Sequence, residues 1–362
     1  MAKLRILIAG GGTGGHIIPA LAVARELEKV HAAEVLFVGT PRGLESRLVP
    51  AAGFNLRMIR VGQLKNVPLK TQLRTLLDLP LGAITCFRLL ISFKPGAVLS
   101  VGGYASGPAA AAALLMGIPT MALEPNAMPG MANRMIGPYV RAAAVSFPAA
   151  TRFFRHAEVT GIPVRPEFFS LEPPPAQPPH LLIFGGSQGA RLFNTVVPKI
   201  VPELLRAVPG LTILHQSGPR FVAETEAMYR ASGADSLVWT VKPFLDDMPA
   251  RIARANLVLA RSGASTVAEL AAAGKPSLLV PFAAAADDHQ KRNAEEMVRA
   301  GAAEMLEEPE FGTPDKLLES LAGLLNDQVR LEAMATAART QAHPDAAERI
   351  ARKLVELAGF PT

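Results

Sequence analysis

Residues Leu4 to Pro19 read LRILIAGGGTGGHIIP, and this stretch predicts the architecture of the first half of the chain. The apolar run over residues 4–9 has the length and composition of a buried strand. Glycines occupy five of the six positions 10–15, His16 follows, and Pro19 suits the first turn of a helix over 20–29. A strand, a glycine turn and a helix in succession aim backbone N–H groups and a positive helix end at an anion.

The composition indicates an α/β protein of more than one domain. The 362 residues suggest about two domains of roughly 150 residues each. Hydrophobic residues make up 49% and charged residues 19%, which supports large cores and argues against disorder. The only cysteine, Cys86, excludes an internal disulfide. We expect a cytoplasmic protein, because the N-terminal run is too short for a signal peptide and no stretch resembles a membrane span.

The charge is distributed unevenly along the chain. Residues 1–162 contain 17 Lys and Arg against 7 Asp and Glu, whereas residues 163–362 contain 20 against 24. A basic half indicates an acidic partner, which could be a phosphate-bearing substrate, a nucleic acid or an anionic membrane surface. Aromatic residues are only 6% and there is no nucleic-acid-binding motif, so we expect no nucleic acid partner.

Strand-like and helix-like segments alternate in both halves, which predicts two parallel sheets covered by helices. A proline-rich segment over 161–179 predicts a linker between them. Ligands of such sheets bind at the carboxyl ends of the strands, so we expect two Rossmann-like halves that face each other across a cleft. The expected strands are 4–9, 35–38, 56–61, 97–101, 119–123, 142–146, 157–160, 180–184, 212–216, 237–241, 257–260 and 277–280.

The glycine turns could hold several kinds of ligand. The spacing of Gly10, Gly12 and Gly15 allows a dinucleotide, but the second strand ends Val38-Gly39-Thr40 without the acid that a ribose needs. No GxxxxGK[ST] loop, zinc pattern or DxD spacing occurs, so we expect no cofactor and no metal. A diphosphate would then be neutralised by helix dipoles, loop amides and arginines.

Several motifs occur together and in order, and they resemble one family over nearly the whole chain. They are GGTGGHIIPALAVA at 11–24, GGYASGP at 102–108, GGSQGAR at 185–191, RSGASTVAE at 261–269 and PF with DDHQKRNA at 281–294. The chain thereby resembles the bacterial peptidoglycan N-acetylglucosaminyltransferases of the MurG type. It departs from them at Pro125, where a glutamine is usual, and in the four alanines at 283–286.

The resemblance implies a GT-B glycosyltransferase with an acceptor- and membrane-facing domain over 1–162 and a UDP-sugar domain over 163–342. A helix within 343–362 would pack back on the first domain. The implied reaction is metal-independent, inverting transfer of N-acetylglucosamine from UDP-N-acetylglucosamine to a lipid-linked N-acetylmuramyl-pentapeptide diphosphate, which converts lipid I to lipid II at the cytoplasmic face of the inner membrane. Proteins of cell-wall synthesis would be further partners. Alternatives are another GT-B enzyme using a UDP-sugar, such as a lipid glycosyltransferase or UDP-sugar epimerase, and a non-catalytic nucleotide-sugar-binding protein.

The resemblance also implies the donor site. Glu269 would accept hydrogen bonds from the ribose, Ser187 and Gln188 would contact the diphosphate, and Gln290 the sugar hydroxyls. The residues alone leave other roles open: Glu269 could be an ordinary helix residue, Arg165 a solvated linker arginine and Leu245, with Phe244 nearby, core filling. The full set is Thr13, Gly14, Gly15, Asn126, Arg165, Ser187, Gln188, Leu245, Ala264, Ser265, Thr266, Val267, Ala268, Glu269 and Gln290.

For the acceptor diphosphate the resemblance implies Gly12, Gly102, Gly103, Tyr104, Ser106 and Gly107. His16 is the leading candidate for the general base, because an ordinary histidine titrates near neutral pH. His16 could instead hydrogen-bond a substrate and shape the loop without moving a proton. Glu124 is the weaker alternative for the base.

The segment from Arg60 to Lys94 has two interpretations. It could be a helical connector that buries one face on the sheet, or a membrane-surface patch in which basic residues meet anionic lipid. Both could hold for different faces. Its charged residues are Arg60, Lys65, Lys70, Arg74, Asp78, Arg88 and Lys94, and its apolar ones are Leu69, Leu73, Leu76, Leu77, Leu81, Ile84 and Phe87.

Overall fold

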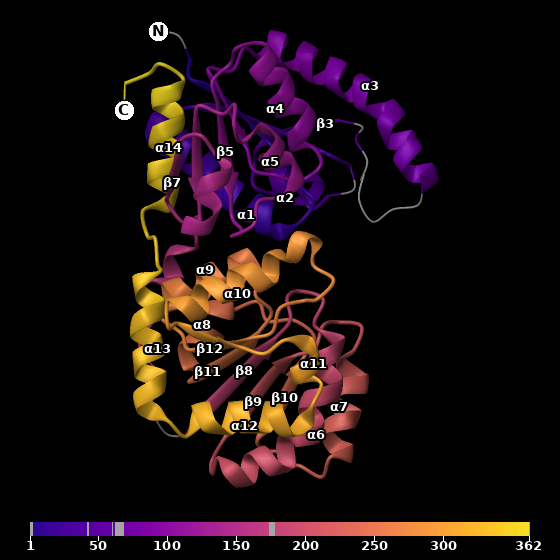
Figure 1. Cartoon of the computed structure of the whole chain (residues 1–362), viewed down its shortest axis with the longest axis vertical. Coiled ribbons are helices and arrows are strands. Elements are labelled where there is room, and N and C mark those ends of the chain that lie inside the picture. Colours follow the sequence, from indigo (N-terminus) through magenta and orange to yellow (C-terminus); the bar gives the residue numbers. More distant parts are fainter. Residues whose placement is uncertain (1–2, 42, 60, 62–68, 174–177, 362) are drawn as a thin grey trace. The chain divides into compact units, whose positions relative to one another are not determined.

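The computed structural model describes the whole chain except residues 1–2, 42, 60, 62–68, 174–177 and 362, and the side chains of 69–80 and 286. The chain divides into two compact units. Unit 1 comprises residues 1–164 and 343–362, and unit 2 comprises residues 165–342 (Figure 1). The C-terminal segment therefore belongs to the same unit as the N-terminus.

Among the described residues, unit 1 contains a seven-stranded parallel sheet in the order β3-β2-β1-β4-β5-β6-β7. The strands are β1 (Arg5–Ala9), β2 (Glu34–Gly39), β3 (Asn55–Met58), β4 (Ala97–Ser100), β5 (Thr120–Glu124), β6 (Ala142–Val145) and β7 (Ala157–Val159). The helices are α1 (Gly14–His31), α2 (Glu45–Ala51), α3 (Leu69–Phe93), α4 (Ser106–Leu115), α5 (Met131–Ile136), α14 (Ala346–Leu357) and the 3₁₀ helix η1 (Pro148–Phe153).

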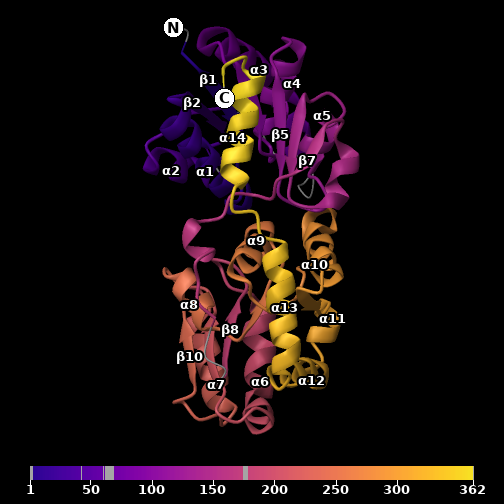
Figure 2. The same cartoon turned by 90° about the vertical axis from the view of Figure 1, so that its left-hand side faces the viewer.

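Helix α1 begins earlier than we predicted. It starts at Gly14, directly after the glycine turn, so that Pro19 lies inside the helix and not in its first turn. Pro19 has no N–H to donate to the Gly15 carbonyl, and the helix continues regardless because its apolar side is buried against the sheet. Helix α14 packs on α1 and β4, and Arg349 forms an ion pair with Glu158 of β7 (Figure 2).

The structure describes only part of the Arg60 to Lys94 segment. Arg60 and Lys65 lie outside the described residues, and so do the side chains of Leu69, Lys70, Leu73, Arg74, Leu76, Leu77 and Asp78. In the remaining part of α3, Cys86 and Leu90 are buried in a cluster with α4 and β4. Leu81, Ile84 and Ile91 are exposed, as is Arg88.

Among its described residues, unit 2 repeats this plan with a six-stranded parallel sheet in the order β10-β9-β8-β11-β12-β13. Its strands are β8 (His180–Phe184), β9 (Thr212–Gln216), β10 (Trp239–Lys242), β11 (Leu257–Ala260), β12 (Ser277–Leu279) and β13 (Ala303–Met305). Its helices are α6 (Arg191–Ala207), α7 (Val222–Ala231), α8 (Met248–Arg254), α9 (Ala264–Ala273), α10 (His289–Arg299), α11 (Glu308–Phe311), α12 (Pro314–Leu325), α13 (Gln328–Thr340) and the 3₁₀ helices η2 (Pro166–Phe168) and η3 (Ala286–Asp288).

Both units are Rossmann-like, as predicted. The sequence did not predict β13, because three residues with Glu304 in the middle carry no strand pattern. In each sheet the strand order reverses between two neighbouring strands, β1 and β4 in unit 1 and β8 and β11 in unit 2. Ligands of open α/β sheets bind beyond the carboxyl ends of strands at such a switch point.

Candidate functional site

The switch point of unit 1 brings two glycine turns together. The turn after β1 and the turn after β4 meet where the Gly11 N–H donates to the Gly102 carbonyl at 3.3 Å. A Cβ on Gly103 would lie 2.2 Å from the Gly11 carbonyl oxygen, and Gly103 has a φ of +81°. Two backbones can therefore approach this closely only because side chains are absent.

His16 lies in the first turn of α1, beside this pair of turns. A Cβ on Gly102 would lie 3.1 Å from His16 Cε1, so the half-buried imidazole packs directly over the Gly102 backbone. The predicted base and the predicted acceptor turn are thus neighbours. In the same turn Tyr104 is 42% exposed, whereas Ser106 is buried and donates its hydroxyl hydrogen to the Gly103 carbonyl at 2.8 Å.

Glu124 ends β5 and is buried. Its carboxylate accepts from the Asn126 N–H at 3.0 Å, from Asn126 Nδ2 at 3.1 Å and from Asn133 Nδ2 at 3.0 Å. Burial raises the pKa of Glu124 to about 7, and the hydrogen bond from Asn133 acts in the opposite direction. Ser100 holds Asn133 in turn, donating to its Oδ1 at 2.9 Å. This network fixes Asn126 even though Pro125 precedes it.

The Gly12 N–H is already used within the protein. It donates to the carboxylate of Glu45 at 2.8 Å. The predicted contact of Gly12 with an acceptor diphosphate therefore lacks its backbone donor. The sequence did not point to Glu45, because no local sequence pattern connects an acidic residue with a glycine turn 33 residues earlier.

In unit 2 the turn after β8 carries Ser187 and Gln188, which are both exposed. Gln216 at the end of β9 links this turn to the segment after β10. Its Nε2 donates to the Gly186 carbonyl at 2.9 Å, and its Oε1 accepts from the Leu245 N–H at 3.1 Å. The sequence signal for Gln216 was its position as a polar residue at the carboxyl end of the expected strand 212–216.

The second turn at this switch point leads into α9. Gly263 precedes the helix, and the predicted donor residues Ala264, Ser265, Thr266, Val267, Ala268 and Glu269 form its first two turns. N–H groups in the first turn of a helix have no partner inside the helix and attract anions. This helix start is therefore suited to a phosphate group.

Glu269 of α9 and Arg165, which precedes η2, lie near each other in unit 2. Burial raises the pKa of Glu269 to about 7, and the positive charge of Arg165 lowers it. The Arg165 guanidinium lies over the Phe168 ring, 5.0 Å from its centroid. The fold thus brings a linker arginine close to the carboxylate expected at the ribose.

Gln290 in the first turn of α10 is tied to the segment before α9. The Ser262 hydroxyl donates to its backbone carbonyl at 2.8 Å, and its Oε1 accepts from the Phe282 N–H at 3.0 Å. Arg261 was not among the predicted site residues. Its guanidinium donates to the carbonyls of Val280 and Pro281, directly before Phe282. It is buried and forms an ion pair with Glu308 at 2.6 Å.

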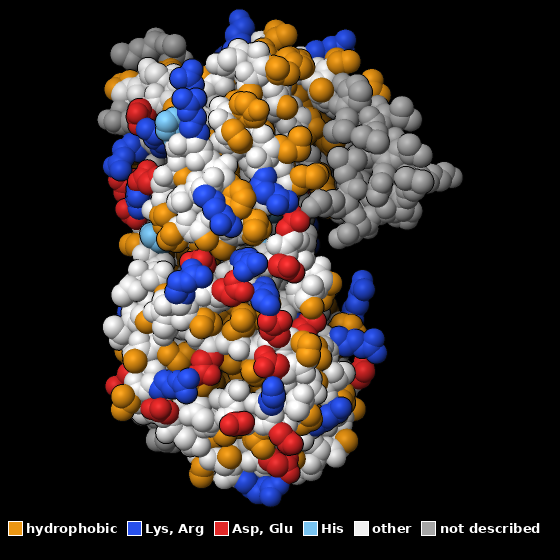
Figure 3. All heavy atoms as spheres, viewed as in Figure 1, with side chains coloured by type: hydrophobic (Ala, Val, Ile, Leu, Met, Phe, Trp, Pro, Cys, Tyr) orange, Lys and Arg blue, Asp and Glu red, His pale blue; other side chains and the backbone are white. Residues whose placement is uncertain are grey.

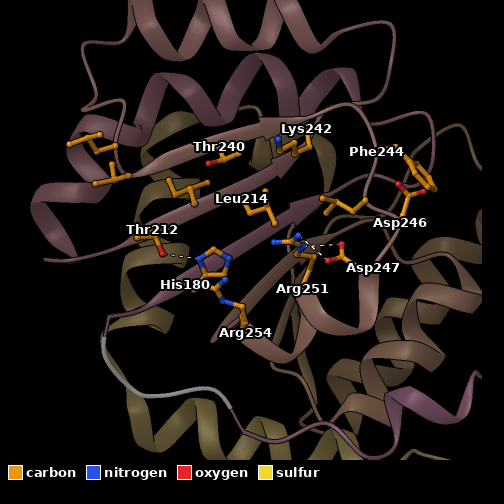
Figure 4. A pocket seen from close by; sticks show the side chains of 14 residues that line it. His180, Thr212, Leu214, Thr240, Lys242, Phe244, Asp246, Asp247, Arg251 and Arg254 are labelled. Carbon is orange, nitrogen blue, oxygen red and sulfur yellow. Dashed lines mark hydrogen bonds and ion pairs between the residues drawn. The ribbon is translucent and has the colours of Figure 1, made fainter.

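A groove of about 480 Å³ runs along the face of β8, β9 and β10 beside α8. Figure 4 shows Phe244 and Asp246 on one side of the groove, and His180 beside Thr212 and Arg254. His180 Nδ1 lies 2.7 Å from the Thr212 hydroxyl, and Arg251 pairs with Asp247 at 2.9 Å. Of the predicted donor residues, only Leu245 lines this groove. Within the described part of the chain, no group of three or more His, Cys, Asp or Glu side chains could hold a metal ion.

Known proteins resemble both the sequence and the structure. The N-terminal domain of glycosyltransferase family 28 matches residues 6–145, and the C-terminal domain of that family matches residues 180–350. The UDP-N-acetylglucosamine–N-acetylmuramyl-(pentapeptide) pyrophosphoryl-undecaprenol N-acetylglucosamine transferase of Solibacter usitatus is 46% identical over 356 residues, which cover 97% of this chain and 96% of the relative. The transferase of the same name from Anaeromyxobacter dehalogenans strain 2CP-C is 44% identical, over 98% and 93% of the two chains.

Solved structures agree with these relatives. The crystal structure of MurG from Acinetobacter baumannii superposes with a TM-score of 0.81 at 30% identity, covering 98% of this chain and 100% of that one. The calicheamicin glycosyltransferase CalG4 superposes with a TM-score of 0.68 at 17% identity, covering 99% of each chain. The second likeness concerns the fold alone.

Proposed function

The chain belongs to glycosyltransferase family 28, and we propose that it transfers N-acetylglucosamine from UDP-N-acetylglucosamine to an N-acetylmuramyl-pentapeptide carried on undecaprenyl diphosphate. The product would be lipid II of peptidoglycan synthesis. The observation that carries this proposal is identity above 40%, over nearly the full length of both chains, to transferases of that name.

We assign the chemical roles to residues at the two switch points. The acceptor hydroxyl oxygen attacks the anomeric carbon while the bond to the UDP oxygen breaks, which inverts the configuration, and His16 takes the hydroxyl proton. Arg165 and the first turn of α9 compensate the charge of the donor, and no metal ion takes part. Glu269 accepts hydrogen bonds from the ribose. Glu124 remains the weaker alternative for the base, because its carboxylate oxygens already accept hydrogen bonds within unit 1.

Three other functions are compatible with the same fold. A UDP-sugar epimerase or another lipid glycosyltransferase would bind a UDP-sugar at the α9 turn, and a binding protein would do so without turnover. Transfer of radiolabelled N-acetylglucosamine to a lipid-linked muramyl-pentapeptide distinguishes the proposal from these alternatives. We expect a labelled lipid product, and conversion of the sugar without acceptor would favour an epimerase.

A thermal shift separates the transferase from a dehydrogenase. Ligands that bind only the folded chain raise its melting temperature. UDP-N-acetylglucosamine should therefore raise it, whereas NAD should leave it unchanged. Stabilisation by NAD and none by the UDP-sugar would contradict the proposal.

We further propose that the enzyme acts at the cytoplasmic face of the inner membrane as a peripheral protein. In the ranges that the structure describes, no helix is long and apolar enough to cross a membrane. Leu81, Ile84, Arg88 and Ile91 are all exposed and follow helical spacing along one side of α3. Figure 3 shows hydrophobic side chains gathered over α4 and the C-terminal part of α3. A lipid-carried acceptor and a basic N-terminal half support this location.

A further inference from the structure

Glu45 is a buried acid outside the residues assigned above. It is the first residue of α2, and its side chain is fully buried. One carboxylate oxygen accepts from the Gly12 N–H at 2.8 Å. The other accepts from the N–H and the hydroxyl of Thr40, at 2.8 and 2.9 Å. A buried carboxylate is unfavourable unless such donors surround it, and here they come from two separate turns.

Three glycines leave the space that this side chain fills. A Cβ would lie 2.1 Å from Glu45 Cδ if placed on Gly11, 2.4 Å from its Cγ if placed on Gly39, and 1.9 Å from its Oε2 if placed on Gly43. The three positions belong to the turn after β1, the end of β2 and the segment before α2. The site is therefore built around a carboxylate from several directions.

Gly12 is held at both of its polar groups by this region. Its N–H donates to Glu45, and its carbonyl accepts from the Leu44 N–H at 3.3 Å. Thr13, the residue that caps α1, makes no capping hydrogen bond with its own side chain. The start of α1, and with it His16, is thus restrained through Gly12.

We propose that Glu45 is a positioning residue that serves as a built-in anion for the glycine turn. It occupies the Gly12 N–H, so a ligand phosphate is directed to the N–H groups of Gly14 and Gly15 in the first turn of α1. It also sets the orientation of the turn that carries His16. This inference rests on the proposed transferase function. Glu45 itself touches no reacting group.

The test compares Glu45→Gln with Thr40→Val in the full-length enzyme. The glutamine keeps the volume but turns an NH₂ group toward backbone N–H donors, which displaces the turn. Because misplacement by about 1 Å can cost about 100-fold in rate, we expect kcat to fall roughly 10- to 100-fold with both substrates saturating. Thr40→Val removes only the hydroxyl donor, so we expect kcat to stay within about threefold. Most of the predicted donor residues belong to unit 2, so calorimetric binding of UDP-N-acetylglucosamine should weaken less than kcat falls in Glu45→Gln and should stay within about twofold in Thr40→Val.

A second variant covers the case in which Glu45→Gln does not fold. Gly43→Ala keeps the carboxylate but forces it aside, and it should lower kcat in the same way. The proposal is overturned if either folded variant keeps kcat within twofold of the wild type per folded molecule, including the case in which only the melting temperature falls. If the wild-type enzyme makes no lipid product at all, the proposed function fails instead, which is a separate result.

Discussion

His16 and Glu269 both lie on a helix that follows a glycine turn, but their surroundings differ. The imidazole of His16 is half-buried and packs over the Gly102 backbone. Burial of Glu269 raises the pKa of its carboxyl group, and the positive charge of Arg165 partly offsets this shift. A base needs access to a proton, and a ribose contact needs a carboxylate, so each environment suits the role we propose for it.

Replacing His16 by alanine should lower kcat by about 10²- to 10⁴-fold, which is the usual contribution of a positioned base. The loss should persist with both substrates saturating. Steady-state kinetics with the lipid acceptor measures it, and donor binding by calorimetry is the control. Near-normal turnover would assign the proton transfer to another group, with Glu124 as the next to test.

Donor affinity should depend on pH through Glu269. The pKa of Glu269 is raised to about 7, so in the free protein its carboxylate becomes protonated as the pH falls below 7. The affinity for UDP-N-acetylglucosamine should then fall by up to about tenfold per pH unit. In Glu269→Gln, binding should be roughly 10- to 100-fold weaker at pH 8, with this pH dependence removed. Calorimetry from pH 5.5 to 8 measures both, with the exposed Glu319→Gln as the matched control. An unchanged pH dependence in Glu269→Gln would exclude the ribose contact.

The segment between β5 and α5 is organised by one buried acid. The Glu124 carboxylate accepts a hydrogen bond from the Gly130 N–H at 3.3 Å, in addition to those from Asn126 and Asn133. Both ends of the segment are thereby tied to the end of β5. This arrangement holds Asn126 at the carboxyl edge of the sheet, where a sugar contact is expected.

The charge on Glu124 should make stability depend on pH. Its pKa is raised from 4.5 to about 7 in the folded protein, so between these values the folded state binds more protons than the unfolded state. The free energy of unfolding should therefore decrease as the pH rises from 4.5 to 7. Relative to Glu124→Gln, the wild type should lose roughly 1–3 kcal/mol over this range.

Urea unfolding of both proteins at several pH values measures this difference. The exposed Glu28→Gln in the same unit controls for the loss of a carboxylate as such. If the difference in the free energy of unfolding between wild type and Glu124→Gln did not change with pH, the pKa of Glu124 would not be raised in the folded protein.

At the scale of the whole molecule, both units use one plan, in which adjacent strands at a switch point present two glycine turns. Helix α3 adds a feature that unit 2 does not repeat in its described residues: an exposed apolar stripe that includes a basic residue. Anionic lipid attracts such a residue by about 1 kcal/mol per charge. The stripe is the described part of the membrane surface that we propose.

The full-length protein should co-sediment with anionic phospholipid vesicles at low salt, and much less with zwitterionic ones. Arg88→Glu and Ile84→Asp should each weaken binding, the charge reversal by about tenfold or more. Arg25→Glu on the exposed side of α1 makes the same charge change elsewhere in unit 1. Equal effects of Arg25→Glu and Arg88→Glu would place the contact away from α3.

Local patterns by themselves determined the α/β class, most strand positions and the resemblance that led to the family. Apolar runs and glycine spacings are short-range signals, so 180–184 and 212–216 coincide with β8 and β9. The same signals misplaced the start of α1 at Pro19, because burial outweighed the proline. They also missed β13, which is held by pairing with β12 and not by its own composition.

Only the tertiary structure decided which turns meet and what holds them. Strand order places the turn after β1 beside the turn after β4, about 90 residues later in the chain. Glu45 reaches Gly12 across 33 positions, and Gln216 reaches Leu245 across 29. A buried polar group is selected by the donors around it in space, and neighbours in sequence do not specify those donors.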